Sequence, residues 1–318
     1  MEPSMSRSSR AFLCSLTLLL PLFSCSQNPP HHRSLAYGYG TNWEIHLYEG
    51  EASFAEEIAD FVSSSSLVLD PKASAVPDGL SALNSSRYLD KPSPFLSEAI
   101  ALGEKTKGES GGSYSFSLGR LTAAWKSSLE KKEVLGDEVR LSLLEEARST
   151  YVEKEGERVY LRGNGELDFS SLGKGLCLKH ILGMLQEKNI TKYFINAGTS
   201  SMLFGENVVN EGYVTVHLED APGKSFRAKN CALSTSSVAK QGVEIDGVLY
   251  SHIIDPETGR ADLGDVALCL VGEDPALLDA YSTAYLAKGG EGLEELSSKG
   301  IAYAYMKEGK VLADEGLF

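Results

Sequence analysis

The chain of 318 residues is 42% hydrophobic and 23% charged, which is typical of a soluble globular protein and excludes a largely disordered chain. Its 30 basic and 44 acidic residues give a formal net charge of -14. Because such a charge repels a phosphate backbone, we expect no nucleic acid among its partners.

Residues 1–24 predict a signal for export. Arg7 and Arg10 supply positive charge ahead of an almost unbroken apolar run at residues 11–23. About thirteen apolar residues are too few to cross a bilayer, which takes roughly 20. The segment is therefore typical of a signal peptide rather than a transmembrane helix.

The apolar run ends in Leu-Phe-Ser-Cys at residues 22–25, which resembles a bacterial lipobox. This resemblance implies cleavage before Cys25 and attachment of lipid to its sulfur, whereas an ordinary secretory signal and an uncleaved anchor are the alternatives. Residues 25–34 have the proline-containing, polar composition of a tether, and residues 35–318 follow as the folded domain. We expect an exported protein, anchored to a membrane by its lipid and facing the periplasm or the cell surface.

Cys177, Cys231 and Cys269 are the cysteines of the domain, because Cys14 lies in the signal. Their wide spacing and odd number exclude a complete disulfide framework. Each lies in apolar sequence, which favours buried free thiols, although one pair could form a bridge in an oxidising compartment.

Hydrophobic periodicity predicts the elements of the first half of the domain. They are a strand at residues 35–48, a helix at 54–62, a compact feature at 80–84, a helix at 96–105, a glycine-rich turn at 108–121 leading to Trp125, and an amphipathic helix at 137–148.

The second half of the domain predicts more strands. We expect two short strands at 159–162 and 166–169, a long apolar helix entered through 170–175 and ending at 185, strands at 193–198, 213–218, 225–227, 248–254 and 266–271, a serine-rich loop at 232–237, a helix at 275–288, and a terminal hairpin at 301–306 and 310–312. No repeat or long linker divides the domain. The pattern predicts one α+β domain of mixed sheets and helices, built from two packed lobes.

A loop of small residues, Ser-Ser-Leu-Gly-Lys-Gly at 170–175, leads into the long apolar helix. A helix N-terminus presents free backbone N–H groups to an anion, and Lys174 adds positive charge. Many ordinary strand-to-helix turns use the same residue types, so a phosphate site and a plain turn are both consistent with this segment.

Asp279 and Thr283 are four residues apart in the predicted helix 275–288 and therefore lie on one face. A carboxylate and a hydroxyl are oxygen ligands suited to Mg²⁺, which takes its remaining ligands from water and substrate phosphates. Alternatively, Asp279 lies on a solvated face near the start of the helix, where an acid is favourable.

The segment Tyr-Ser-His-Ile-Ile-Asp-Pro-Glu-Thr-Gly at 250–259 is the best candidate for chemistry. His252 has an unperturbed pKa near neutrality and stands three residues before Asp255, so a strand end and the following turn could present both to one cavity. Asp-Pro and Thr-Gly are also ordinary turn formers, and a structural turn is the alternative.

Taken in order, these motifs resemble the flavin transferase family known as ApbE. The resemblance covers nearly the whole domain and depends most on residues 250–259 and on Asp-Ala-Tyr-Ser-Thr at 279–283; Gly-Thr at 40–41, Leu-Asn at 83–84, Ile-Asn-Ala-Gly at 195–198 and Ser-Thr-Ser at 234–236 occur in the same order. It implies Mg²⁺-dependent transfer of FMN from FAD to a threonine or serine of an acceptor protein, with release of AMP. Some members hydrolyse FAD to FMN and AMP instead.

The resemblance also implies roles for particular residues. Asp279, the Thr283 hydroxyl and a backbone carbonyl, that of Ser171, match the metal ligands, while His252 and Asp255 match the residues that act near the pyrophosphate. The positions that match contacts to the flavin nucleotide are Tyr39, Ser113, Tyr114, Ser115, Asp168, Lys174, His252 and Ile253.

The chain departs from the family pattern at several positions. Tyr114, Ser115, Phe116 and Ser117 stand for Phe, Asp, Pro and Thr; Thr199 and Ser200 for Gly and Asp; Lys179 for Asp; and Ser237 for Gly. These losses of acids keep open an FAD-binding or FAD-hydrolysing lipoprotein that modifies no partner. From the signal and tether alone, a solute-binding lipoprotein is a further alternative.

Overall fold

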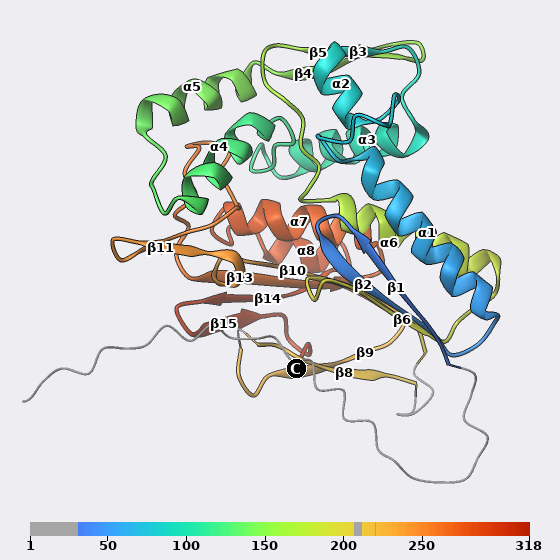
Figure 1. Cartoon of the computed structure of the whole chain (residues 1–318). Coiled ribbons are helices and arrows are strands. Elements are labelled where there is room, and N and C mark those ends of the chain that lie inside the picture. The colour runs from blue at the N-terminus through green and yellow to red at the C-terminus, as the bar shows by residue number, and fades with distance from the viewer. Residues whose placement is uncertain (1–30, 207–211, 220) are drawn as a thin grey trace, which may run out of the picture.

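The computed structural model describes residues 31–206, 212–219 and 221–318. A large antiparallel sheet forms the base of the molecule, and a second lobe of helices with a small sheet stands above it (Figure 1). This arrangement confirms the predicted α+β class with two lobes. Within the described residues, no helix combines the length and apolar character that a membrane crossing requires.

Eight described strands make up the large sheet. In spatial order they are β1 (His32–Gly38), β2 (Thr41–Leu47), β6 (Tyr193–Ala197), β7 (Ser201–Phe204), β10 (Cys231–Ser237), β13 (Val266–Gly272), β14 (Ala302–Lys307) and β15 (Lys310–Ala313). Every neighbouring pair is antiparallel. β14 and β15 confirm the predicted terminal hairpin.

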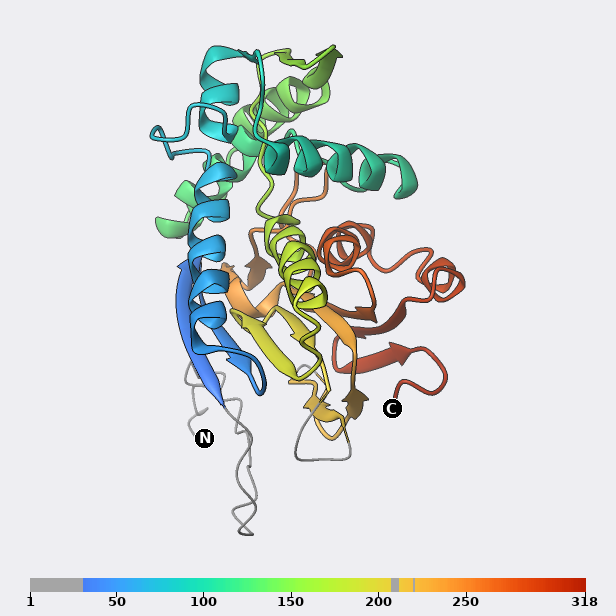
Figure 2. The same cartoon turned by 90° about the vertical axis from the view of Figure 1, so that its right-hand side faces the viewer.

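Helices cover one face of this sheet. α1 (Ala52–Val68), α6 (Gly173–Glu187) and α7 (Pro275–Ala287) lie beside one another there, and α8 (Glu294–Ser298) follows α7 (Figure 2). Their apolar side chains and the sheet form the main hydrophobic core. The opposite face is covered by the hairpin of β8 (Val214–His217) and β9 (Ser225–Ala228), which has its own apolar cluster.

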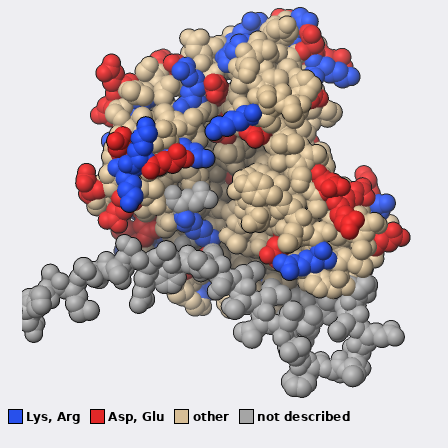
Figure 3. Space-filling view, viewed as in Figure 1, with Lys and Arg blue, Asp and Glu red and all other residues tan. Residues whose placement is uncertain are grey.

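The upper lobe comprises α2 (Leu80–Ser86), α3 (Pro94–Glu109), α4 (Gly119–Glu130), α5 (Asp137–Arg148) and the small sheet of β3 (Tyr88–Leu89), β5 (Arg158–Arg162) and β4 (Tyr151–Glu155). The 3-10 helix η1 (Ala239–Gln241) and the hairpin β11 (Val243–Ile245) and β12 (Val248–Tyr250) come after β10. On the face in Figure 3, acidic and basic side chains are interspersed and form no continuous basic surface.

Two boundaries at the start of the domain differ from expectation. β1 begins at His32, inside the predicted tether, because residues 32–34 already pair with β2. The single strand predicted at 35–48 is a hairpin, since Tyr39 and Gly40 adopt φ values of 55° and 73° and reverse the chain. Cys25 and the signal peptide lie outside the described residues.

The helix predicted at residues 54–62 is longer because it continues through a run of serines. The Ser63 hydroxyl donates to the carbonyl of Ala59 at 3.1 Å and the Ser66 hydroxyl to that of Ser63 at 2.8 Å. Such bonds to the preceding turn satisfy the hydroxyls within the helix.

Residues 166–169 form no strand of a hairpin, contrary to expectation; β5 pairs with β3 and β4 instead. This segment is extended, and the Asn84 side chain forms hydrogen bonds with both the backbone carbonyl and the backbone N–H of Leu167. The Asn84 amide donates to the Leu167 carbonyl at 3.0 Å, and the Leu167 N–H donates to the Asn84 side chain at 2.9 Å. The residues flanking Leu167 pair with the backbone before α4, since the N–H of Asp168 donates to the carbonyl of Phe116 at 2.8 Å and that of Gly119 to the carbonyl of Glu166 at 2.9 Å.

The serine-rich loop predicted at residues 232–237 is the interior strand β10, which pairs with β7 and β13. Helix α7 supplies hydrogen-bond partners for the hydroxyls of Ser234 and Ser236, whereas the buried hydroxyl of Ser237 has no partner among the described residues. The strand predicted at 248–254 ends at Tyr250 and is followed by irregular backbone. Cys177 and Cys269 are buried as expected, whereas Cys231 is partly exposed.

Candidate active site

A cavity of about 260 Å³ lies where the two lobes meet. Its walls come from the turn before α4, the start of α6, strand β10, helix α7 and the segment after β12. The predicted site residues that line it are Tyr39, Ser113, Tyr114, Ser115, Asp168, Ser171, Lys174, His252, Ile253, Asp279 and Thr283. The fold therefore brings together side chains spread over most of the domain.

Asp279 is the most constrained of these side chains. It is 4% exposed, so the alternative of a solvated helix face is wrong. Oδ1 accepts hydrogen bonds from the hydroxyls of Ser201 (3.0 Å) and Ser234 (2.9 Å), and Oδ2 accepts one from the N–H of Gly175 (2.9 Å). A carboxylate has about four acceptor positions, so these bonds orient it and leave capacity for one more ligand.

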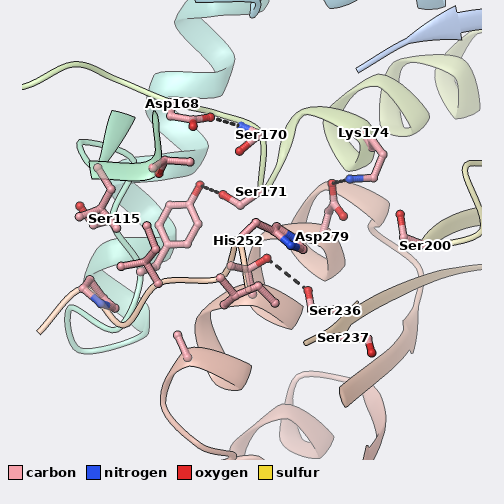
Figure 4. Close-up of a pocket in the computed structure, with 18 of the residues that line it drawn as sticks. Ser115, Asp168, Ser170, Ser171, Lys174, Ser200, Ser236, Ser237, His252 and Asp279 are labelled. Atoms are coloured by element: carbon pink, nitrogen blue, oxygen red, sulfur yellow. Dashed lines mark hydrogen bonds and ion pairs between the residues drawn. The ribbon is translucent and has the colours of Figure 1, made fainter. Parts of the chain in front are cut away.

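Helix α6 approaches Asp279 closely because its first turn is rich in glycine. A methyl group on Gly175 would lie 2.3 Å from the carbonyl oxygen of Pro275, and one on Gly173 would lie 2.9 Å from the ring of Tyr39. The same turn carries Lys174, whose Nζ is 3.9 Å from Asp279 Oδ2 (Figure 4). A helix N-terminus and an ammonium group thus face the cavity, which is the geometry that an anion site needs.

The predicted metal ligands meet in this cavity. Thr283 lies one turn beyond Asp279, with Oγ1 3.3 Å from the Ser236 hydroxyl, and the Ser171 hydroxyl is 3.0 Å from that of Tyr114. Among the described residues, no three His, Cys, Asp or Glu side chains gather as a metal-binding group. A single carboxylate with neutral oxygens is unlike a zinc site but fits Mg²⁺, which retains waters and takes ligands from phosphates.

The His252 imidazole projects into the space near Ser171, Asp279 and Ser236 (Figure 4). Solvent reaches the ring through the cavity, yet the walls remove enough hydration to lower its pKa below the ordinary 6.5. The positive charge of Lys174 lowers this pKa further, while Asp168 acts in the opposite direction. The ring is therefore neutral at pH 7 and able to accept a proton.

Asp255 is not among the residues that line the cavity. Its Oδ1 accepts from the N–H of Glu257 at 2.8 Å, its Oδ2 accepts from the Thr258 hydroxyl at 2.6 Å, and the N–H of Gly259 donates to its carbonyl at 2.7 Å. The carboxylate thus closes the turn after His252, as the structural alternative for this segment proposed. Its predicted action near the pyrophosphate stays a prediction.

Two tyrosines on the predicted flavin-binding walls, Tyr39 and Tyr114, are buried phenols with raised pKa values. The Tyr39 hydroxyl donates to Ser65 at 2.9 Å, and burial raises the pKa of this tyrosine well above its ordinary value. Burial also raises the pKa of Tyr114 far above neutrality. Both phenols are therefore protonated, which makes them hydrogen-bonding groups rather than bases.

One further wall of the cavity lies outside the predicted site residues, although Ser-Thr-Ser at 234–236, Ser200 and Ser237 entered the family comparison; it contains Ser200, Thr235, Ser236, Ser237 and Lys240. The Lys240 ammonium lies 3.6 Å from a carboxylate oxygen of Glu219. A run of hydroxyl residues inside apolar sequence was the available signal. Taken as a loop, it gave no reason to expect the hydroxyls to point at α7.

The departures from the family pattern fall into two groups. Ser115 and Ser200 line the cavity, so the missing acids change its chemistry. Lys179 instead pairs with Glu98 on α3 at 3.1 Å, away from the cavity lining, and Thr199, with φ of 65°, forms the turn between β6 and β7. Those two substitutions leave the walls of the cavity unchanged.

The start of α6 with Lys174, the oxygen groups of Asp279 and Thr283, and the His252 imidazole thus lie in one cavity of a mixed α/β fold. The ApbE family model matches residues 39–305, and the chain belongs to the ApbE family.

Known members share parts of this sequence and its fold. The FAD:protein FMN transferase of Escherichia coli K12 is 26% identical over 179 residues, 53% of this chain and 49% of that protein; the one of Klebsiella pneumoniae strain 342 is 23% identical over 67% of this chain and 64% of that protein. The E. coli match thus spans about half of its relative.

Solved structures show the same fold. The ApbE protein of Thermotoga maritima superposes with a TM-score of 0.78 at 19% identity, over 90% of this chain and 97% of that one. The flavin transferase ApbE of Vibrio cholerae gives 0.73 at 19% identity, over 91% and 99%.

Proposed function

We propose that this protein is an exported, Mg²⁺-dependent FAD:protein FMN transferase that moves FMN from FAD to a threonine or serine of an acceptor protein and releases AMP. The observation that carries the proposal is the meeting of Asp279 and Thr283, Lys174 at a helix start, and the neutral imidazole of His252 in one cavity. Similarity to curated transferases supports FAD as the substrate.

The phosphate end of the substrate is assigned to the start of α6. Lys174 and the positive end of the α6 dipole attract the pyrophosphate oxygens. Asp279, Thr283 and the backbone of Ser171 would hold Mg²⁺, which neutralises phosphate charge and polarises the phosphoryl group. The hydrogen bonds from Ser201 and Ser234 keep the carboxylate of Asp279 oriented throughout.

The proton of the acceptor hydroxyl is assigned to His252. As the hydroxyl oxygen forms a bond to the phosphorus of the FMN moiety, the bond from that phosphorus to the AMP oxygen breaks. The imidazole takes the hydroxyl proton, and AMP leaves with the electron pair of the broken bond. A base with a lowered pKa stays unprotonated near neutral pH, which is the state that the step requires.

Mass spectrometry of a candidate acceptor incubated with the protein, FAD and Mg²⁺ tests this function. We expect the acceptor to gain the mass of FMN, and His252→Ala to slow transfer by about 10²–10⁴-fold while FAD still binds. His217→Ala is the matched control, because His217 is exposed on β8 and outside the cavity lining.

Other outcomes would replace the proposal. Free FMN and AMP without a modified acceptor would identify a hydrolase, which the serine at position 115 would then help to explain. FAD that stays bound and unchanged would identify a flavin-binding lipoprotein. Transfer by His252→Ala at the wild-type rate would remove the imidazole from the mechanism.

We also propose a lipid on Cys25 that anchors the protein to a membrane. The charged start, apolar run and Leu-Phe-Ser-Cys ending at residues 22–25 support it. Labelled palmitate should enter the wild-type protein in a bacterial host and be absent from Cys25→Ser. Equal labelling of both would refute lipid attachment at this cysteine.

A further inference from the structure

His252 is carried on an arm that folds back on itself. The N–H of Ser251 donates to the carbonyl of Ala261 at 2.9 Å, and the N–H of Asp255 donates to that of Arg260 at 2.9 Å. The imidazole thus belongs to a short paired segment whose tip is residues 256–259. Whatever fixes this tip also limits the movement of the ring.

Side chains of helices α4 and α5 donate hydrogen bonds to three successive carbonyl groups of the tip. Arg148 donates to the carbonyl of Glu257 and Arg140 to that of Thr258. The indole N–H of Trp125 donates to the carbonyl of Gly259 at 2.8 Å. These three donors, which we call the clamp, lie more than 100 residues away in sequence from the carbonyls they bind.

Apolar packing joins the arm to the same two helices. The Tyr250 ring stacks on Trp125 with centroids 5.6 Å apart, and Ile254 lies in one cluster with Leu121 and Leu144. This cluster is separate from the main core, which contains Leu278 and other neighbours of Asp279 on α7. Directly after His252, Ile253 packs in the main core and Ile254 in the cluster with α4 and α5, so these two helices supply part of the support for the arm.

The same two helices also support one wall of the cavity, next to the start of α4. The Ser117 hydroxyl, just before α4, donates to the carbonyl of Ala147 on α5 at 2.9 Å, and Ser113 to Ser115 line the cavity next to it. The α4 and α5 pair thus supports both this wall and the His252 arm. The distance of the wall and of the His252 arm from the predicted metal ligands therefore depends on the position of α4 and α5.

We propose that Trp125, Arg140 and Arg148 are positioning residues that hold the His252 arm at the distance from the phosphate site at which proton transfer occurs. The inference rests on the function proposed above and assigns a role to residues that do not line the cavity. Removing the donors leaves the walls from α6, β10 and α7 in place and loosens the arm, so the loss falls mainly on kcat rather than on KM for FAD. A displacement of about 1 Å in such a group lowers turnover by as much as 10²-fold.

The test measures FMN transfer by three variants. The first carries Arg140→Met and Arg148→Met together, the second carries Arg140→Lys and Arg148→Lys together, and the third carries Trp125→Phe. Methionine keeps much of the side-chain length without a donor, lysine restores a donor, and phenylalanine keeps an aromatic ring. Arg158→Met is the matched control, since Arg158 pairs with Asp90 in the small sheet outside the cavity lining. We expect kcat to fall about 10- to 100-fold in the methionine pair, with KM for FAD within twofold of wild type and partial recovery in the lysine pair.

Unchanged kcat would overturn the inference, as would a loss that appears equally in KM for FAD or in the control. Hydrogen exchange gives a reading that is independent of activity. In the methionine pair, the amides of residues 251–255 should exchange faster while those of α7 keep the wild-type rate; unchanged exchange in the arm overturns the inference. If the wild-type protein transfers no FMN, the proposed function fails, and the exchange result alone decides whether the clamp holds the arm.

Discussion

Substitution of Gly175 by alanine should push apart the two helices that form the phosphate side of the cavity. The added methyl group would lie 2.3 Å from the Pro275 carbonyl oxygen and 2.5 Å from the Asp279 Cβ, whereas ordinary contacts begin near 3.4 Å. Neither atom is at the end of a flexible side chain. Relief therefore requires α6 and α7 to separate by roughly 1 Å, in an interior packed like a crystal.

The magnitude follows from two opposing contributions to the free energy of unfolding. Overpacking of a tight core costs about 1–3 kcal/mol, while replacement of glycine by alanine inside a helix gains about 0.5–1 kcal/mol. Gly183→Ala is the matched control, because it lies in the same helix and a methyl group there meets nothing within 4 Å. Gly183→Ala should therefore stabilise the protein and Gly175→Ala should destabilise it.

Thermal unfolding of both variants measures this difference. We expect Gly175→Ala to melt below wild type and Gly183→Ala slightly above it, at about 2–4 °C per kcal/mol for a domain of this size. FAD turnover should fall only in Gly175→Ala, because the N–H to Asp279 bond stretches as the helices part. Equal melting temperatures for the two variants would refute the reasoning about close approach.

Three further predictions concern protonation, thiol reactivity and metal. In the pH profile of kcat/KM, the acid limb should have its inflection below pH 6.5, because the pKa of His252 is lowered. Lys174→Met should raise this inflection by removing a positive neighbour of His252, and Asp168→Asn should lower it by removing a negative one. Shifts of the reverse sign would contradict the assignment of the inflection to His252. Burial raises the pKa of Cys177 to about 12, so a maleimide should label the partly exposed Cys231 first, and equal rates by mass spectrometry would count against this. Removal of divalent ions with EDTA should stop FAD turnover until Mg²⁺ is restored, and full activity in EDTA would exclude a metal.

Local patterns in the sequence were enough to predict several parts of the site. The four-residue spacing placed Asp279 and Thr283 on one helix face, and the glycine and lysine pattern placed Lys174 at a helix start. Both features depend on residues within one or two helical turns. For that reason they needed no knowledge of the tertiary fold.

Other features could not be read locally because their partners are distant in sequence. Ser201 and Ser234, which orient Asp279, precede it by 78 and 45 residues. The serine run in β10 lacks the alternation of a half-buried strand because α7 supplies its partners. Catalytic and turn-forming aspartates share the sequence pattern around Asp255. Only the hydrogen bonds of the folded turn show that its carboxylate closes the turn.

The order of strands in the large sheet also constrains the order of folding. β2 pairs with β6, yet the entire upper lobe is encoded between them. A two-stranded ribbon such as β1 with β2 is only marginally stable alone. During synthesis it must therefore wait for residues 193–197, and closing so long an intervening segment adds an entropic barrier. We expect this late closure to make the N-terminal hairpin the part of the sheet most exposed to mispairing before the domain is complete.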